Sequence, residues 1–468
     1  MNLELNIMIR PHWENDTISF IDYELNSPNI TISSGEPMIC RFDDAFGGLC
    51  PFPVMEYLKI EDEKGVLRYE ENEIPSFNSG IKCFGYFPER AVEGTLRWCY
   101  RALPRVLPEG YRSSPYYDFR AEPGGLNGSG FFSFLLPATE KEMNVSLSWD
   151  MSCMPAGSRA IFSFGEGNIK KTMNVIDLGI SLFTVGMIRA VENDSLGIYY
   201  LSEPEFQVGP IAEKLFPIFQ YEKEYFNDPN ASFKIFLRRD PFVISNGGSA
   251  CRYAFISGYS AFGGFDPDKW FNTLLHEMTH TWPYMDDNNV GEGTWFTEGA
   301  TEYYCTWLPY IGGFLDDDFT VKCLNEKIGK RYYQNPFREM PNMEIPKIQW
   351  KERHAQECPY GRGFLYLANT EAQLRRAGKG SIDDMIKQFG WDRPMHPEDW
   401  REFLRERLGQ DAVVQFDEMT EGKLLEPDPD IFENRFRVVK DEIELNGQKV
   451  LSYHFETKNK KENHSNDK

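Results

Sequence analysis

The chain has 468 residues, enough for two or three domains with cores of their own, and 41% of its residues are hydrophobic, 15% aromatic and 26% charged. Its formal net charge of −22 would repel a nucleic-acid backbone over most of the surface, so no nucleic-acid partner is expected. The sequence has no apolar run of the roughly 18 residues needed to span a bilayer. We therefore expect a globular protein without a membrane segment.

The cysteines and the first residues indicate the compartment. Nine cysteines are scattered along the chain without a C-x-x-C pair, a pattern typical of free thiols. The first residues, MNLELNIMIRPHW, lack the basic start and apolar core of a signal peptide. These features predict a cytoplasmic protein, and they leave the oligomeric state open.

Residues 1–168 are predicted to form a β-rich domain. Short runs of alternating or continuous apolar residues are separated by Gly, Pro and Asn, which favours a β-sandwich-like fold. The clearest predicted strands are residues 17–25, 94–101, 130–137 and 143–149. Their aromatic residues would suit a carbohydrate-binding face, but aromatic side chains in strands more often belong to a core.

Residues 169–315 are predicted to form a mixed α/β domain. Helical periodicity covers residues 211–225 despite Pro217, and residues 233–238 have the pattern of a strand. Residues 246–260 contain a glycine turn followed by an apolar strand. That strand either pairs with the backbone of an extended substrate or is an ordinary structural strand, and the sequence favours neither interpretation.

The next segment carries H-E-x-x-H, formed by His276, Glu277 and His280. Asp266 is a suitable helix cap, and an apolar stripe at helical spacing follows it until Pro283. On a helix, two histidines four positions apart project from nearly the same face and can bind one ion. The motif therefore predicts half of a zinc site.

A second predicted helix, residues 295–307, offers Glu298 as the third ligand. Two imidazoles and one carboxylate leave a fourth zinc position open, as in catalytic rather than structural sites. The alternative is a chance histidine pair, but the chain has only seven histidines, so the full motif would rarely arise by chance. Glu302, one turn later, either accepts a hydrogen bond from the second ring nitrogen of His276 or His280, or is an ordinary surface carboxylate.

Residues 316–430 are predicted to be mainly helical, with helices at residues 364–377, 381–389 and 397–408. The segment Tyr360-Gly-Arg-Gly363 is expected to open the first of them. Residues 431–468 are predicted to form a β-hairpin around Asn446-Gly447, followed by a mobile tail. The expected fold class is therefore α+β with several domains.

Three motifs resemble those of the gluzincin zinc metallopeptidases: H-E-M-T-H-T-W at 276–282, W-F-T-E-G-A-T-E-Y-Y at 295–304, and P-Y-G-R-G at 359–363. Within this group the chain is most similar to the glycyl-aminopeptidase family, which is related to aminopeptidase N and leukotriene-A4 hydrolase. The resemblance covers roughly residues 1–410. It implies a β-sandwich-like domain, a thermolysin-like zinc catalytic domain and a helical domain. It also implies Zn²⁺ as cofactor, peptides as substrates, and Tyr360 as a tyrosine that assists catalysis.

The substrate-binding segment departs from the family's pattern. In the family, a glycine pair, here Gly247 and Gly248, precedes a glutamate that binds the free α-amine of the substrate, and this chain has Ala250 in that place. The loop 281–297 is also one residue shorter than in the aminopeptidase N pattern. Its acidic residues Asp286 and Glu292 are the candidate replacements for the missing glutamate.

These residues together predict a mechanism. Zinc held by His276, His280 and Glu298 would activate water, with Glu277 as the general base and Tyr360 as a donor to the developing oxyanion. The prediction is a zinc-dependent metallopeptidase, with an aminopeptidase as the first candidate. One alternative is an endopeptidase or a hydrolase of another small substrate, which the missing glutamate favours. The other is an inactive zinc-stabilised binding protein, against which the intact general base argues.

Overall fold

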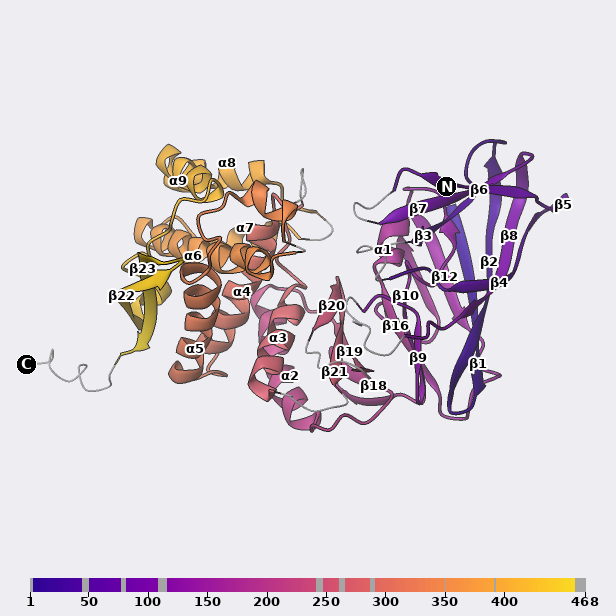
Figure 1. The fold of residues 1–468 in the computed structure, drawn as a ribbon, viewed down its shortest axis with the longest axis horizontal. Helices are drawn as coiled ribbons and strands as arrows, with labels where there is room; N and C mark the ends of the chain where they lie inside the picture. The colour runs from indigo at the N-terminus through magenta and orange to yellow at the C-terminus, as the bar shows by residue number, and fades with distance from the viewer. Residues whose placement is uncertain are drawn as a thin grey trace, which may run out of the picture. The chain divides into compact units, whose positions relative to one another are not determined.

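The computed structural model describes residues 3–43, 50–76, 81–107, 116–240, 247–260, 266–286, 291–349, 351–390 and 393–458. The chain forms two compact units: Met1–Glu213 with Ser232–Trp270, and Lys214–Ala231 with Phe271–Lys468. The first is built mostly from strands and the second mostly from helices (Figure 1). This mixed content agrees with the expected class, whereas the four predicted domain boundaries stay a prediction and most of the predicted tail lies outside the described residues.

Three sheets contain the N-terminal strands of the first unit. The seven-stranded sheet has the order β15 (Ile169–Met173), β12 (Met143–Trp149), β1 (Leu3–Glu14), β2 (Thr17–Ile32), β8 (Val92–Leu103), β4 (Val54–Asp62) and β5 (Gly65–Val66). A four-stranded sheet has the order β11 (Leu136–Pro137), β3 (Ile39–Asp43), β7 (Lys82–Pro88) and β6 (Tyr69–Ile74). A five-stranded sheet has the order β14 (Gly165–Glu166), β13 (Arg159–Phe162), β16 (Leu182–Gly186), β10 (Gly125–Ser129) and β9 (Arg120–Glu122).

Alternation of buried and partly exposed residues explains why these segments form strands. In β1, Leu5, Ile7 and Ile9 are buried while the residues between them are partly exposed, as expected for a sheet with one face on a core. Their core also contains the buried aromatic rings of Tyr23 and Trp98. The strands predicted at 17–25, 94–101 and 143–149 are confirmed as parts of β2, β8 and β12.

The strand predicted at residues 130–137 is wrong, because only Leu136–Pro137 pairs as a strand. The preceding residues form a turn, in which the Phe134 N–H donates to the Gly130 carbonyl at 3.0 Å. A Cβ on Gly130 would lie 1.9 Å from the Leu178 carbonyl oxygen, so this close approach requires glycine. The apolar run reflects a buried turn, which periodicity alone cannot distinguish from a buried strand.

The first unit also contains helix α1 (Val175–Gly179) and a second five-stranded sheet. The order in that sheet is β17 (Arg189–Glu192), β18 (Leu196–Tyr200), β19 (Phe233–Asp240), β21 (Ala254–Ser260) and β20 (Gly248–Cys251). Strands β18, β19 and β21 are parallel neighbours, and β20 runs antiparallel to β21 at the edge. The strands predicted at 233–238 and within 246–260 are therefore confirmed.

The main helices lie wholly or mostly in the second unit. They are α2 (Gly209–Tyr225), α3 (Pro267–Thr279), α4 (Thr294–Ile311), α5 (Asp317–Leu324), the π-helix η1 (Asn325–Tyr333), the 3₁₀ helix η2 (Asn342–Lys347), α6 (Arg353–Ala377), α7 (Asp383–Gln388), α8 (Pro397–Leu408), α9 (Gln410–Thr420) and the 3₁₀ turn η3 (Ile431–Asn434). The helices predicted at 211–225, 381–389 and 397–408 are confirmed as α2, α7 and α8. Within the described residues, no helix combines the length and apolar character needed to cross a membrane.

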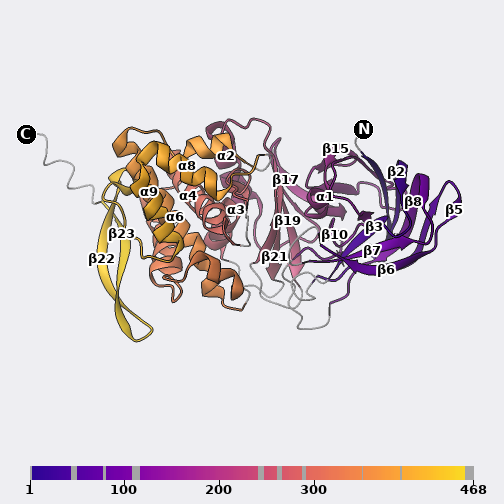
Figure 2. The ribbon, with the colours of Figure 1, turned by 90° about the horizontal axis from the view of Figure 1, so that it is seen from above.

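The predicted C-terminal hairpin is confirmed as β22 (Phe436–Leu445) and β23 (Gln448–Thr457), seen beside the helices of its unit in Figure 2. Asn446 and Gly447 have φ angles of 54° and 76°, the left-handed values of a two-residue hairpin turn. Asn325 joins the hairpin to η1, because its side-chain amide donates to the Phe455 carbonyl and accepts from the Phe455 N–H, both at 2.8 Å.

Helix α6 begins at Arg353, eleven residues before the predicted helix at 364–377 and seven before Tyr360, so Tyr360 lies inside the helix and does not open it. The exposed polar residues of its first turn and the internal Pro359 conceal the periodicity there, although Ala355 and Cys358 are already buried. Helices α4 and α6 pack against one another, as Figure 1 shows. Tyr360 is thereby placed beside the helix that carries Glu298.

Candidate metal centre

Three side chains converge in the second unit: His276 from α3, His280 from the turn directly after α3, and Glu298 from α4. His276 Nε2 and His280 Nε2 are 3.0 Å apart, and Glu298 Oε2 lies 3.2 Å from the first and 3.3 Å from the second. With zinc–ligand bonds of 2.0–2.1 Å, adjacent ligands of a tetrahedral site are separated by about 3.3 Å. The three predicted ligand atoms therefore have the mutual spacing of a zinc site.

The hydrogen bonding of these atoms also fits a cation. Glu298 Oε2 is buried and has no hydrogen-bond partner, although a buried carboxylate oxygen normally finds a donor. The two Nε2 atoms that face it can each present a lone pair. A divalent cation would satisfy all three atoms at once, so the residues present fit bound zinc.

Local structure explains why the histidines share a face. The Asp266 side chain caps α3 by accepting from the backbone N–H groups of Asp268 and Lys269, at 3.1 and 3.2 Å. The apolar stripe of the helix, which includes Leu274 and Met278, is buried, and the two histidines follow at a spacing of four residues. The predicted helix and its cap are therefore confirmed.

Two hydrogen bonds fix the end of the segment that precedes residues 287–290, which lie outside the described residues. The Met285 N–H donates to Thr297 Oγ1 at 3.1 Å, and the Asp286 N–H donates to the Met395 carbonyl at 2.8 Å. The loop shortened by one residue therefore still delivers Glu298 to the two histidines.

Each histidine has a different neighbour at its Nδ1 atom. His276 Nδ1 lies 3.4 Å from Glu302 Oε1, an ion-pair distance, but it makes no hydrogen bond to any described residue, so the hydrogen bond expected for Glu302 stays a prediction. His280 Nδ1 lies 3.0 Å from Thr301 Oγ1, which in turn donates to the Thr297 carbonyl. Such contacts hold the imidazole rings in orientation. Thr301 was missed by the sequence analysis, and its position three residues after Glu298 was the available signal.

Glu302 is 1% exposed and is held by two cations from η1. Lys327 Nζ lies 2.6 Å from Glu302 Oε2, and the Arg331 guanidinium donates to Oε1. Burial acts to raise the pKa of Glu302, but Lys327 and Arg331 outweigh it and hold the pKa well below its usual range. Glu302 is therefore an ionised, buried carboxylate and not the surface residue of the alternative interpretation.

The charged groups of the protein itself favour a protonated His276 and an ionised Glu298. Burial acts to lower the pKa of His276, but the nearby carboxylates, above all Glu302, raise it well above the usual value. Burial acts to raise the pKa of Glu298, but the two histidines bring it to about 2. The carboxylate is thus ionised at neutral pH and available to a cation.

Glu277 and Tyr360 border the same centre. Burial raises the pKa of Glu277, although the two histidines oppose this shift. The Tyr360 ring stacks on the His276 ring, with centroids 5.6 Å apart and planes 17° from parallel. Burial and the nearby Glu298 and Glu277 raise the pKa of the Tyr360 hydroxyl well above its usual value, so it remains a proton donor in hydrogen bonds.

Gly247, Gly248 and Ala250 belong to the first unit and are described with it. Gly248 and Ala250 lie on the edge strand β20. The Ala250 carbonyl accepts a hydrogen bond from the Tyr117 hydroxyl, and Ser249 Oγ accepts from the Tyr116 N–H at 2.8 Å. The carbonyl of Ala250 is therefore already engaged, which reduces the backbone available for pairing with a substrate.

A second cluster of potential ligands shares His276. Atoms of His276, Glu302 and Cys305 lie within 4.8 Å of one another. Lys327 Nζ contacts both Glu302 and Cys305, at 2.6 and 3.0 Å, so a cation already occupies this position. Repulsion from that ammonium disfavours a metal ion here.

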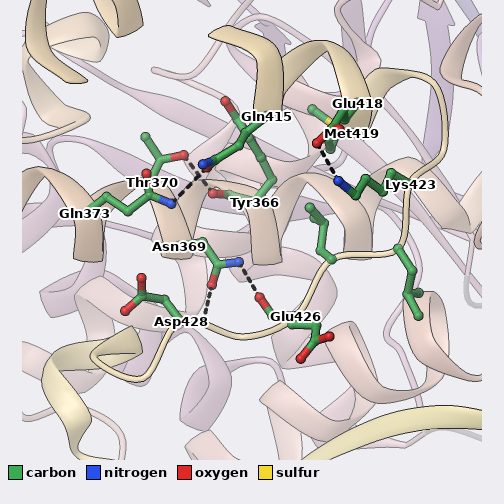
Figure 3. A pocket seen from close by; sticks show the side chains of 12 residues that line it. Tyr366, Asn369, Thr370, Gln373, Gln415, Glu418, Met419, Lys423, Glu426 and Asp428 are labelled. Carbon is green, nitrogen blue, oxygen red and sulfur yellow. Dashed lines mark hydrogen bonds and ion pairs between the residues drawn. The ribbon is translucent and has the colours of Figure 1, made fainter. Parts of the chain in front are cut away.

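A cavity of about 210 Å³ lies elsewhere in the second unit, lined mainly by α6, α9 and residues 423–428 (Figure 3). The amide of Asn369 in its wall donates to the Glu426 carbonyl and accepts from the Asp428 N–H, both at 2.8 Å. Its lining includes none of the residues of the metal centre. We therefore do not assign the chemistry to this cavity.

Comparisons with known proteins agree with this arrangement at the level of fold. The sequence matches no protein-family model and no curated protein. The structure is similar to an aminopeptidase N family protein from Idiomarina loihiensis, with a TM-score of 0.67 and 14% identity over 94% of this chain and 79% of the other. It is also similar to an M1 zinc metallopeptidase from Deinococcus radiodurans, solved with a Tyr-Ser-Ala substrate, with a TM-score of 0.53 and 15% identity over 91% and 96% of the two chains.

A third similar structure is native yeast leukotriene-A4 hydrolase, with a TM-score of 0.56 and 12% identity over 92% of this chain and 70% of the other. These identities are too low to show more than a shared fold. The expected relationship to the gluzincin fold is therefore confirmed, whereas the three-domain layout implied by the resemblance stays a prediction. The chain has the fold of the M1 metallopeptidases and leukotriene-A4 hydrolase, in agreement with its resemblance to the gluzincins.

Proposed function

We propose that the protein is a zinc-dependent metallopeptidase with His276, His280 and Glu298 as ligands. The observation that carries the proposal is the convergence of two imidazole nitrogens and one unpartnered carboxylate oxygen at separations of 3.0 to 3.3 Å. Three protein ligands leave a fourth position for water or substrate, which is the composition of a catalytic site. The zinc proteins of the same fold support the choice of metal.

The bound zinc would polarise a water molecule and the carbonyl of the scissile peptide bond. Glu277 accepts the proton of that water and passes it to the leaving amine, and its raised pKa makes it a stronger base than an exposed carboxylate. The Tyr360 hydroxyl donates to the oxygen that becomes negatively charged during attack. Glu302 lies at the Nδ1 atom of His276 and Thr301 at that of His280, so they orient the two rings from the side opposite the Nε2 atoms.

An aminopeptidase is the first candidate for the type of cleavage. Aminopeptidase N family proteins and a tripeptide-bound metallopeptidase share the fold, and the three motifs resemble the glycyl-aminopeptidase family. Gly247 and Gly248 would then lie beside the substrate backbone. Asp286 and Glu292 are the acidic residues of the loop 281–297 that are candidates to bind the substrate amine.

An endopeptidase is the second candidate, because the glutamate that would bind the α-amine of the substrate is missing. Ala250 stands where the resemblance requires a carboxylate, and its carbonyl is bonded to Tyr117. A site without a carboxylate for the α-amine would bind free and blocked peptides alike. We also propose a reducing, cytoplasmic location, which is supported by the lack of a disulfide within the described residues.

The proposal is tested by hydrolysis of fluorogenic peptides with the full chain and the Glu277→Gln variant. We expect the wild-type protein to cleave at least one peptide and Glu277→Gln to retain zinc but lose hydrolysis, because the amide cannot accept the proton. Glu213→Gln is the control, because it makes the same change at an exposed residue of α2, and it should retain full activity. Undiminished hydrolysis by Glu277→Gln would remove the assignment of the base.

Each peptide is also supplied with an acetylated N-terminus to separate the two candidates. An aminopeptidase needs the free amine, so acetylation should abolish cleavage of the N-terminal residue. Equal rates for free and acetylated peptides would favour the endopeptidase. Bound zinc without cleavage of any peptide would favour the zinc-stabilised binding protein instead.

A further inference from the structure

A lysine and a cysteine are in direct contact behind the metal centre. Lys327 Nζ lies 3.0 Å from Cys305 Sγ, 2.9 Å from Thr306 Oγ1 and 2.6 Å from Glu302 Oε2. Lys327 is 5% exposed and Cys305 is 1% exposed. The amine and the thiol are thus held together in a site that bulk water does not reach.

The local helices fix this contact. Glu302, Cys305 and Thr306 lie on successive turns or neighbouring positions of α4, and Lys327 comes from the π-helix η1. A lysine ammonium has three donors, and these are directed at one carboxylate, one hydroxyl and one sulfur. Because the buried charge is paired with Glu302, the amine cannot readily swing away from Cys305.

We propose that Cys305 and Lys327 are a covalent modification site, at which dioxygen links the sulfur and the nitrogen through one bridging oxygen atom. The thiol, the ammonium and one molecule of dioxygen give the S–O–NH bridge, one molecule of water and one proton, which is released. One S–H bond and two N–H bonds are lost, and the S–O and O–N bonds form. Sulfur and nitrogen each give up two electrons, and the four electrons reduce both oxygen atoms.

Cys323 provides a built-in comparison. It is buried in the same part of the second unit, on α5, but its thiol contacts Asn272 Oδ1 at 3.3 Å. A reaction controlled by burial and by access of the oxidant would modify both cysteines. A reaction controlled by contact with the amine would modify Cys305 alone.

The bridge would change the charges around Glu302, the carboxylate beside His276. Lys327 is one of two cations on Glu302, and Glu302 lies 3.4 Å from His276 Nδ1. A nitrogen bonded to oxygen is far less basic than an amine, so the bridge would remove one of those charges. Since loss of such outer contacts typically weakens metal binding about 10- to 100-fold, we expect the oxidised protein to release zinc more readily. A reductant would restore the lysine and the thiol.

The test compares the full-length protein after exposure to dioxygen with the same sample after treatment with dithiothreitol. Protease digestion and mass spectrometry should show a cross-linked peptide pair containing Cys305 and Lys327, heavier by one oxygen and lighter by two hydrogens, that separates on reduction. Cys305→Ser and Lys327→Arg should lack the pair, and Cys323→Ser should retain it. This readout needs neither peptidase activity nor bound metal, so it is independent of the proposed function.

Two results would overturn the proposal. The first is the absence of the bridged pair from oxidised wild-type protein, which involves no variant and no question of folding. The second is a disulfide between Cys305 and Cys323 in its place. For the effect on the metal, zinc retention against a competing chelator is measured on the oxidised and reduced wild type. An about tenfold or greater difference is expected, and equal retention in a sample that carries the bridge would overturn the coupling to the metal centre.

Discussion

The close contact between α4 and α6 gives the most demanding test of the geometry. Gly299, the residue after the ligand Glu298, faces Gly363, three residues after Tyr360. A Cβ on Gly363 would lie 1.8 Å from the Trp295 carbonyl oxygen and 3.0 Å from Gly299 Cα, and a Cβ on Gly299 would lie 2.5 Å from the Gly363 backbone. The glycines of the two motifs therefore set the separation between the helix of Glu298 and the helix of Tyr360.

The magnitude of a Gly363→Ala change follows from that distance. The new Cβ falls roughly 1.6 Å short of ordinary van der Waals contact with a backbone atom, which cannot rotate away as a side chain can. Overpacking of this kind lowers the free energy of unfolding by about 1–3 kcal/mol. The higher helix propensity of alanine raises it by about 1 kcal/mol. Taking the upper end of the cost, we expect a net loss of about 2 kcal/mol in the free energy of unfolding.

Activity should fall further than stability. Relief of the clash moves Tyr360 relative to Glu298, and a misplacement of about 1 Å at a catalytic site costs on the order of 100-fold in rate. The assays are urea denaturation for the unfolding free energy and peptide hydrolysis at saturating zinc for the rate.

Gly329→Ala is the matched control, because a Cβ there would meet only Asn325 atoms, at 3.9 Å or more. It should be neutral or stabilise the protein by up to about 1 kcal/mol. If Gly363→Ala were as stable and as active as wild type and this control, the inferred helix contact would be wrong.

Three further predictions concern single side chains. Burial raises the pKa of Glu222 well above its usual value, so the folded state keeps a proton that the unfolded state loses above about pH 4.3. The stability of wild type should therefore fall relative to Glu222→Gln by about 1.4 kcal/mol per pH unit from that pH up to the folded pKa, and parallel denaturation curves from pH 4 to 8 that never diverge would contradict this. Tyr360→Phe should lower kcat on the order of 100-fold with zinc content unchanged, because one oxyanion donor is lost, and a change confined to KM would argue against that role. Thr301→Val should weaken zinc retention about 10-fold, because His280 Nδ1 loses its hydroxyl contact, and chelator competition that shows no change would exclude a role for Thr301 in positioning that ring.

The sequence predicted well those features that depend on neighbours along the chain. The spacing of His276 and His280, the cap at Asp266 and the Asn446-Gly447 turn each involve residues within a few positions, and the structure contains all of them. Local spacing also identified Glu302 as a candidate neighbour of the histidines, because it lies one helical turn after Glu298.

The sequence could not predict contacts between distant segments. Arg331 lies 29 residues from Glu302 on a π-helix, whose periodicity differs from that of an α-helix. Neither Arg331 nor Lys327 stands in a recognisable motif. The contact of Lys327 with Cys305, 22 residues away, is equally non-local. The wrong strand at 130–137 has the same origin, because Phe131 and Phe134 pack against the distant rings of Phe42 and Tyr23 without being paired in a strand.

The zinc content of the purified full-length chain tests the central claim most directly. Elemental analysis should find one zinc ion per chain in the wild type and a large loss after dialysis in His280→Ala, while the exposed change His354→Ala should leave the metal in place. A wild-type chain that binds no zinc when supplied with it, or a His280→Ala chain that retains it as firmly as wild type, would contradict the account.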